Sequence, residues 1–91
     1  MKNFTYTVTD ENGIHARPAG IIVKTAKQFS SSVSIEMQAD GGENRTADAK
    51  KLFTVMGLGA KKGSVLTVTA EGEDENEAVS EMENAMRNAG L

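Results

Sequence analysis

The fold is set by residues 4–28, FTYTVTDENGIHARPAGIIVKTAKQ, because this stretch passes from a strand pattern through a turn into a helix pattern. Apolar and hydroxyl side chains alternate over residues 4–9, which is the period of a half-buried strand. Residues 10–13, DENG, have the chemistry of a turn. Apolar residues then recur at helical spacing as far as about Gln28: Ala19, Ile22, Val23 and Ala26, with Phe29 as a further candidate. This stretch predicts a strand followed by an amphipathic helix.

The rest of the chain predicts three more strands and a long final helix. Residues 33–37 and 66–70 alternate as strands, and residues 45–47 predict a short strand after a polar hairpin loop at residues 39–44. Residues 61–63, KKG, form a turn before the last strand. The final helix is indicated by one apolar stripe: Ala78, Val79, Met82, Ala85, Met86 and Ala89. Its start is predicted at a capping box formed by Asp74 and Glu77.

The apolar cluster at residues 52–56, LFTVM, fits either of two structures. A short helix would follow an N-cap at Asp48 and end at Gly57 or Gly59, whereas a strand is the competing interpretation. With the helix, the order is strand, helix, strand, strand, short helix, strand, helix. This order predicts a single α+β domain over residues 1–91, with helices covering one face of an antiparallel sheet.

Composition limits the classes of function. A chain of 91 residues with 38% hydrophobic residues is enough for one compact domain but not for a deep substrate cleft. The absence of cysteine excludes disulfides and thiolate metal sites and favours the cytoplasm. A formal net charge of -3 argues against nucleic-acid binding, and no stretch has the roughly 18 apolar residues of a membrane span. We expect a cytoplasmic monomer that needs no cofactor or metal and has no membrane insertion.

His15 is the only histidine of the chain, and its neighbours favour an anion beside it. Pro18 lacks a backbone N–H, which costs nothing in the first turn of a helix, so the helix starts just upstream and His15 lies at or near the N-cap. A helix N-terminus offers free N–H groups and positive partial charge, and Arg17 adds a cation that can bind two oxygens.

A neutral imidazole has a nucleophilic nitrogen, and attack on phosphorus would give a phosphohistidine. Phosphoryl transfer asks the protein mainly for positioning and for stabilisation of the oxygens. His15 is therefore predicted to be the phosphoryl acceptor and Arg17 to stabilise the phosphate. A lone histidine is more often a helix cap or a surface side chain, and a lone arginine is more often solvated; it is the combination that favours a phosphate site. Because the chain has no phosphate-cradling Gly-Lys-Ser/Thr loop, the phosphoryl group would come from another protein.

Three segments, in order along the chain, resemble the HPr family of histidine-containing phosphocarriers. Residues 14–19, IHARPA, resemble the phosphorylation-site signature, residues 55–63, VMGLGAKKG, the second signature, and residues 72–78, GEDENEA, the entry to the last helix. The resemblance implies an open-faced β-sandwich in the order βαββαβα, with four antiparallel strands and three helices. It also implies that His15 is phosphorylated through Nδ1 and that Arg17 supports the phosphoryl group.

As a member of this family the chain would be a carrier and not an enzyme. The resemblance implies that it receives a phosphoenolpyruvate-derived phosphoryl group from Enzyme I and passes it to Enzyme IIA of sugar transporters, in the phosphotransferase system. Two departures stand out. Lys51 lies where Gram-positive members carry a serine phosphorylated by an ATP-dependent kinase, and residues 38–48 are about five residues longer than in many relatives. A paralogue in a regulatory or non-sugar phosphorelay, or a phosphorylation-independent adaptor, remains an alternative, although the presence of both His15 and Arg17 speaks against the adaptor.

The predicted partner surface combines apolar and basic residues. Residues 52–56 hold four large apolar side chains, more than one face of a short helix can bury, so at least one of them should be exposed. In the family, the residues corresponding to Leu52, Phe53 and Met56 dock against Enzyme I and Enzyme IIA. Lys24 and Lys27 would lie on the side of the first helix that carries Arg17 and attract acidic partners. The alternatives are a purely internal apolar cluster and ordinary solvated lysines.

Overall fold

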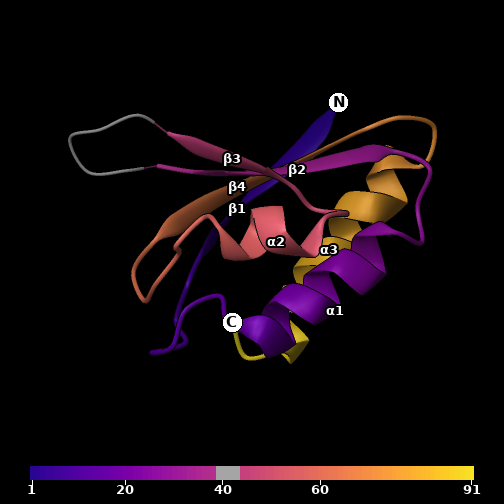
Figure 1. Ribbon diagram of the computed structural model, residues 1–91. Coiled ribbons are helices and arrows are strands. Elements are labelled where there is room, and N and C mark those ends of the chain that lie inside the picture. The colour runs from indigo at the N-terminus through magenta and orange to yellow at the C-terminus, as the bar shows by residue number, and fades with distance from the viewer. Residues whose placement is uncertain (39–43) are drawn as a thin grey trace.

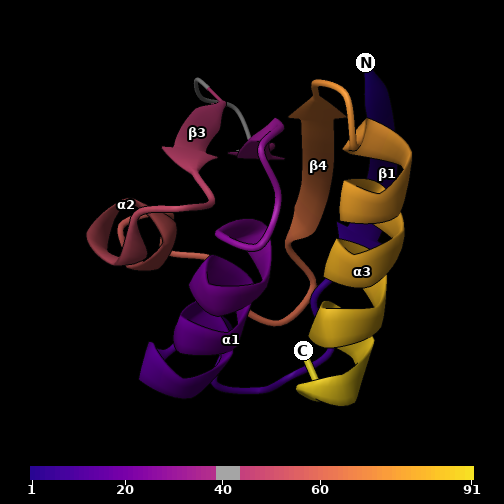
Figure 2. The same ribbon diagram turned by 90° about the vertical axis from the view of Figure 1, so that its right-hand side faces the viewer.

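The computed structural model describes residues 1–38 and 44–91 of the chain. Its elements are β1 (Lys2–Thr7), α1 (Ala16–Ala26), β2 (Ser32–Met37), β3 (Arg45–Asp48), α2 (Leu52–Met56), β4 (Val65–Glu71) and α3 (Glu75–Asn88). The strands form one antiparallel sheet in the order β1-β4-β2-β3. The three helices cover one face of this sheet and leave the other face open (Figures 1 and 2). The predicted α+β fold, an open-faced β-sandwich in the order βαββαβα, is confirmed.

The hairpin loop and the end of the first helix are the two predicted features that the structure does not fully reproduce or describe. Most of the predicted hairpin loop, residues 39–43, lies outside the described residues. The first helix ends at Ala26, because Lys27 already forms the C-cap, and so it is shorter than the pattern to about Gln28 predicted. Within residues 1–38 and 44–91, no helix is both long and apolar enough to cross a membrane.

The register of the strands explains why one face of the sheet carries the core. Phe4 pairs with Val68, Val68 with Ile35, and Ile35 with Ala47, so that one apolar row crosses all four strands. The next row, by contrast, joins Thr5, Thr67, Glu36 and Thr46. Because successive side chains of a strand point to opposite faces, the apolar row faces the helices and the polar row faces the open side.

The helices supply the other half of the core, mainly with residues that the apolar spacing predicts, although Ala85 and Ala89 of the predicted stripe are only partly buried. The buried residues of α1 are Pro18, Ala19, Ile22, Val23 and Ala26, and those of α3 are Ala78, Met82 and Met86. Val79 and Phe29 are partly buried and pack against this core. Both helices are therefore held in place by an apolar stripe, which fixes the position of the α1 N-terminus relative to the sheet.

Residues 52–56 form the helix α2, so the competing strand interpretation was wrong. The predicted N-cap at Asp48 was also wrong, because Lys51 is the N-cap, and Gly57 is the C-cap. Asp48 instead closes the preceding turn, where its Oδ1 accepts a hydrogen bond from the Lys50 N–H at 2.9 Å. The Thr54 hydroxyl donates to the carbonyl oxygens of Asp48 and Lys51, both at 2.8 Å.

Asp74 is the N-cap residue of α3, but the predicted capping box with Glu77 was wrong, because the Asp74 side chain makes no hydrogen bond to its own helix. Its carboxylate accepts the backbone N–H groups of Ser30 and Ser31, each at 2.9 Å, and the Ser31 hydroxyl. The turn between α1 and β2 thus offers donors that compete with those of the helix. Asp74 connects two segments that lie far apart in the sequence.

Replacing Asp74 by asparagine should flatten the acid dependence of stability. The hydrogen bonds, with the Ser31 hydroxyl first, lower the pKa of Asp74 from 3.8 to about 2. Because the folded pKa lies below the unfolded one, this stabilisation is complete above pH 3.8 and is lost as the pH falls through about 2. Urea denaturation across this range should therefore give a shallower fall in the free energy of unfolding for Asp74→Asn than for the parent. Glu73→Gln, an exposed neighbour, is the control, and an unchanged slope in Asp74→Asn would contradict the assignment.

Candidate functional site

His15 is the N-cap of α1, as the position of Pro18 predicts. Its backbone is extended, with φ -105° and ψ -172°, and its side chain makes no hydrogen bond to the helix. The carbonyl oxygen accepts the Ala19 N–H at 3.0 Å and so closes the first turn. The imidazole is 44% exposed. The backbone of His15 is therefore part of the helix start, while its ring remains accessible to another protein.

The turn before His15 is fixed by backbone hydrogen bonds on both sides. The Gly13 N–H donates to the Asp10 carbonyl oxygen at 3.0 Å, and the Ile14 N–H donates to the Ala60 carbonyl oxygen at 3.1 Å. Gly13 has φ +64°, a conformation that suits glycine, and the Ile14 side chain is buried. These contacts hold the backbone just before His15 against the loop that follows α2.

The start of α1 keeps the donors that an anion needs. The first N–H groups of a helix have no partner within the helix, and here those of Ala16 and Arg17 are the two nearest to His15. Pro18, the third residue of α1, has no N–H to leave unsatisfied. Arg17 is exposed and forms no ion pair with any of the residues that the structure describes. The helix start thus offers two backbone donors, and Arg17, two residues after His15, offers an exposed guanidinium.

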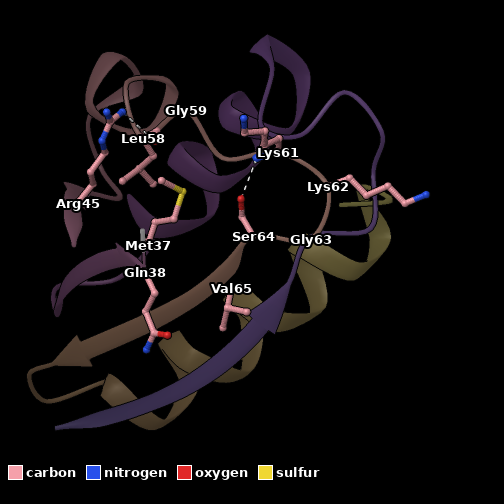
Figure 3. A pocket seen from close by; sticks show the side chains of 10 residues that line it. All are labelled: Met37, Gln38, Arg45, Leu58, Gly59, Lys61, Lys62, Gly63, Ser64 and Val65. Carbon is pink, nitrogen blue, oxygen red and sulfur yellow. Dashed lines mark hydrogen bonds between the residues drawn. The ribbon is translucent and has the colours of Figure 1, made fainter. Parts of the chain in front are cut away.

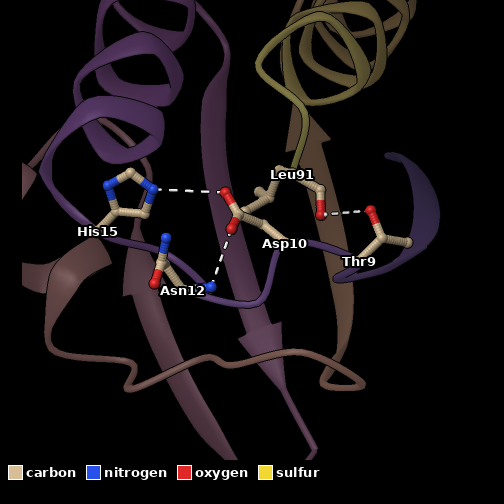
Figure 4. Close-up of polar contacts among 5 residues, drawn as sticks. All are labelled: Thr9, Asp10, Asn12, His15 and Leu91. Atoms are coloured by element: carbon tan, nitrogen blue, oxygen red, sulfur yellow. Dashed lines mark hydrogen bonds and ion pairs between the residues drawn. The ribbon is translucent and has the colours of Figure 1, made fainter.

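Asp10 is the site residue that sequence reasoning missed. Its Oδ2 lies 3.4 Å from Nε2 of His15, and its Oδ1 accepts the Asn12 N–H at 2.9 Å (Figure 4). The hydrogen bond from Asn12 is the main cause that lowers the pKa of Asp10, and His15 adds a smaller effect in the same direction. In the sequence, Asp10 is a residue type typical of turns. It precedes His15 by five positions, but this spacing does not determine the distance between the two side chains across a turn.

The predicted partner residues lie on two neighbouring elements, α1 and α2, which pack beside each other (Figure 2). Phe53 is 84% exposed, Leu52 38% and Met56 37%, whereas Val55 is fully buried. The prediction that at least one of the four apolar residues is exposed is confirmed. Lys24 and Lys27 are exposed too, and their spacing puts them on the face of α1 that carries Arg17.

A hollow between the end of β2, β3 and the turn before β4 does not contain the histidine. Its lining includes Arg45, Leu58, Lys61 and Ser64 (Figure 3). Within it the Lys61 N–H donates to the Ser64 hydroxyl at 3.0 Å, and Arg45 Nη1 donates to the Leu58 carbonyl oxygen at 3.4 Å. These two hydrogen bonds stabilise the loops that line the hollow, and His15 lies outside it.

The fold and the site together define a small domain that presents one histidine at a helix N-terminus beside an arginine. The model of the family described as the PTS HPr component phosphorylation site matches residues 2–88. The chain therefore belongs to the HPr family, the phosphocarrier components of the phosphotransferase system.

Solved structures agree with this membership. The chain is 30% identical to the histidine-containing phosphocarrier protein of a mycoplasma, with a TM-score of 0.91 and coverage of 99% of this chain and 97% of that one. It is 32% identical to phosphocarrier protein HPr from Bacillus anthracis, with a TM-score of 0.75 and coverage of 92% and 94%. It is 34% identical to HPr from Thermoanaerobacter tengcongensis, solved as a dimer, with a TM-score of 0.72 and coverage of 100% and 99%.

Proposed function

We propose that His15 accepts a phosphoryl group through Nδ1 from Enzyme I, which is loaded from phosphoenolpyruvate, and passes it to Enzyme IIA of sugar transporters. One observation carries the proposal: the exposed ring stands at the N-cap of α1 with Nε2 turned toward Asp10, and Nδ1 has no hydrogen-bond partner among residues 1–38 and 44–91. A nitrogen with a free lone pair at a helix N-terminus combines a nucleophile with an anion site.

The remaining groups of the site suit the charge of the transferred group. Phosphoryl transfer depends mainly on positioning and on neutralising the oxygens. The N–H groups of Ala16 and Arg17 and the Arg17 guanidinium can supply both. Because the partner proteins bring the donor and the acceptor, the chain acts as a carrier and needs no metal, cofactor or substrate pocket of its own.

Incubation with phosphoenolpyruvate and a matching Enzyme I should add one phosphoryl group to the chain. Intact-mass measurement should detect the adduct, and acid treatment should remove it, because a phosphorus–nitrogen bond to imidazole is acid-labile. The same mixture should leave His15→Ala unmodified. An adduct that survives acid, or one that persists in His15→Ala, would rule out His15 as the acceptor.

The docking surface of the proposal consists of Leu52, Phe53 and Met56 on α2 together with Lys24 and Lys27 on α1. The three apolar side chains are exposed on a chain whose formal net charge is -3, and the two lysines give this face a local positive charge. An apolar patch with a basic rim favours partners that present apolar side chains and carboxylates.

Replacing Phe53 by serine should raise the KM for both Enzyme I and Enzyme IIA about tenfold with little change in kcat, since truncating a central interface aromatic costs roughly 1–2 kcal/mol. The fold should be unaffected, because the Phe53 side chain is 84% exposed. Steady-state transfer assays with each partner measure the effect. Thr5→Ala, an exposed residue of β1 that faces the open side of the sheet, serves as the control. Equal KM values for Phe53→Ser and Thr5→Ala would exclude Phe53 from the docking surface.

A further inference from the structure

Asp10 is held rigidly beside His15 by contacts on three sides. The Asp10 and Thr9 N–H groups donate to the Leu91 carbonyl oxygen at 3.1 and 2.6 Å, and the Asp10 carbonyl oxygen accepts the Gly13 N–H at 3.0 Å. The third contact is the hydrogen bond from the Asn12 N–H to Oδ1 (Figure 4). The side chain is only 22% exposed. The direction of its second oxygen is therefore set before any partner binds.

The two carboxylate oxygens of Asp10 have different partners, and this determines which nitrogen of His15 carries the proton. Oδ1 is occupied by the Asn12 N–H, and Oδ2 is the oxygen that faces Nε2 of His15 at 3.4 Å. An ionised carboxylate can only accept hydrogen bonds, so the ring nitrogen facing it must carry the proton. We infer that Asp10 is a positioning residue that holds His15 in the tautomer with the proton on Nε2 and the lone pair on Nδ1.

This inference rests on the proposed function and deepens it, because it explains how the reactive nitrogen is prepared. The Nδ1 lone pair forms the new bond to phosphorus while the bond between phosphorus and the donor's leaving group breaks. The proton stays on Nε2, and the ring gains a positive charge that the Asp10 carboxylate offsets. When the phosphoryl group moves on, the electron pair of the phosphorus–nitrogen bond returns to Nδ1. No proton has to leave the ring in either direction.

The variant Asp10→Asn exchanges the donor and acceptor roles in this contact. The Asn12 N–H still requires an oxygen, so the amide of Asp10→Asn keeps its oxygen toward Asn12 and turns its NH2 group toward Nε2. An NH2 group favours a lone pair on Nε2 and thus a proton on Nδ1, the nitrogen that must attack. Nitrogen-15 NMR of the labelled protein, at a pH where His15 is neutral, distinguishes the two tautomers directly.

We expect a predominantly Nε2-protonated ring in the parent and a shift toward the Nδ1-protonated ring in Asp10→Asn. Transfer from Enzyme I should fall about fivefold at low salt, the size of an exposed charge contact, and the difference should shrink at high salt. Glu11→Gln is the matched control, because it removes an exposed carboxylate one residue away and should change neither the tautomer nor the rate.

The NMR measurement needs no phosphoryl donor, so it tests Asp10 separately from the proposed function. An Asp10→Asn ring that keeps the parent tautomer overturns the inference, as does an equal shift in Glu11→Gln. A tautomer shift in a protein that no Enzyme I phosphorylates would support the role of Asp10 in placing the proton and overturn the proposed function instead.

Discussion

Arg17→Ala should transfer phosphoryl groups about 100-fold more slowly than the parent while melting at nearly the same temperature. Loss of one group that stabilises developing charge typically costs a factor of about 100 to 1,000. The lower figure applies here because the site is open to water. The fold should tolerate the change, since Arg17 is exposed and alanine is the best helix former. Rapid-quench transfer assays and circular-dichroism melts measure the two quantities.

Two further variants separate the role of the guanidinium from a general loss of charge. Lys2→Ala removes one positive charge at the start of β1, at the end of the sheet away from the α1 N-terminus, and should leave transfer unchanged (Figure 1). Arg17→Lys keeps the charge but loses the fork that binds two oxygens, so it should recover part of the rate. Parent-like rates for Arg17→Ala with both Enzyme I and Enzyme IIA would show that Arg17 does not act in transfer.

The sequence predicts the sheet layer and the helix layer of this fold because it contains both the two-residue alternation of strands and the three-to-four-residue apolar spacing of helices. The alternation on β1, β2 and β4 and the apolar stripes of α1 and α3 depend on local spacing alone, and all five elements overlap the residues that this spacing marks. Their bounds differ, since β1 spans Lys2–Thr7 where the spacing predicts residues 4–9, and α1 ends at Ala26. The N-cap predicted at Asp48 and the capping box predicted for Asp74 and Glu77 failed for the opposite reason. Asp48 and Asp74 both bind backbone N–H groups outside the helices they precede. For Asp74 the donors are Ser31 and Ser30, which lie 43 and 44 positions away in the sequence.

In the candidate site, too, the features set by local sequence could be predicted and those set by tertiary contacts could not. Pro18 marks the start of α1, and so the position of His15 at the N-cap follows from local sequence. The contact with Asp10 depends on how the turn folds back and on Leu91, three residues after the end of α3, whose carbonyl oxygen accepts the Thr9 and Asp10 N–H groups. That arrangement is tertiary, and no spacing rule over residues 10–15 encodes it. The exposure of at least one apolar residue of α2 could be predicted because a short helix cannot bury four large side chains, but that Phe53 is the most exposed of them follows only from the structure.

Gly13→Ala should lower the free energy of unfolding by about 3 kcal/mol, from the strain of a left-handed residue and the overpacking combined. Gly13 has φ +64°, and a Cβ at this position would lie 2.1 Å from the Ala60 carbonyl oxygen and 2.7 Å from the Lys61 Cα. Both atoms belong to the backbone, so no side-chain rotation relieves the clash. The same Ala60 oxygen accepts the Ile14 N–H, and that hydrogen bond must lengthen or break when the loops separate.

Gly20→Ala is the matched control, because a Cβ at Gly20 in the middle of α1 meets no atom within 4 Å. This variant should gain about 0.5–1 kcal/mol from helix propensity, so urea denaturation at neutral pH should move the two midpoints in opposite directions. Gly13→Ala should also transfer phosphoryl groups more slowly at a temperature where it is still folded. The reason is that His15 lies two residues after Gly13, so that a displaced turn also displaces the histidine. A Gly13→Ala protein as stable and as active as the parent would mean that the contact with Ala60 does not fix the position of the histidine.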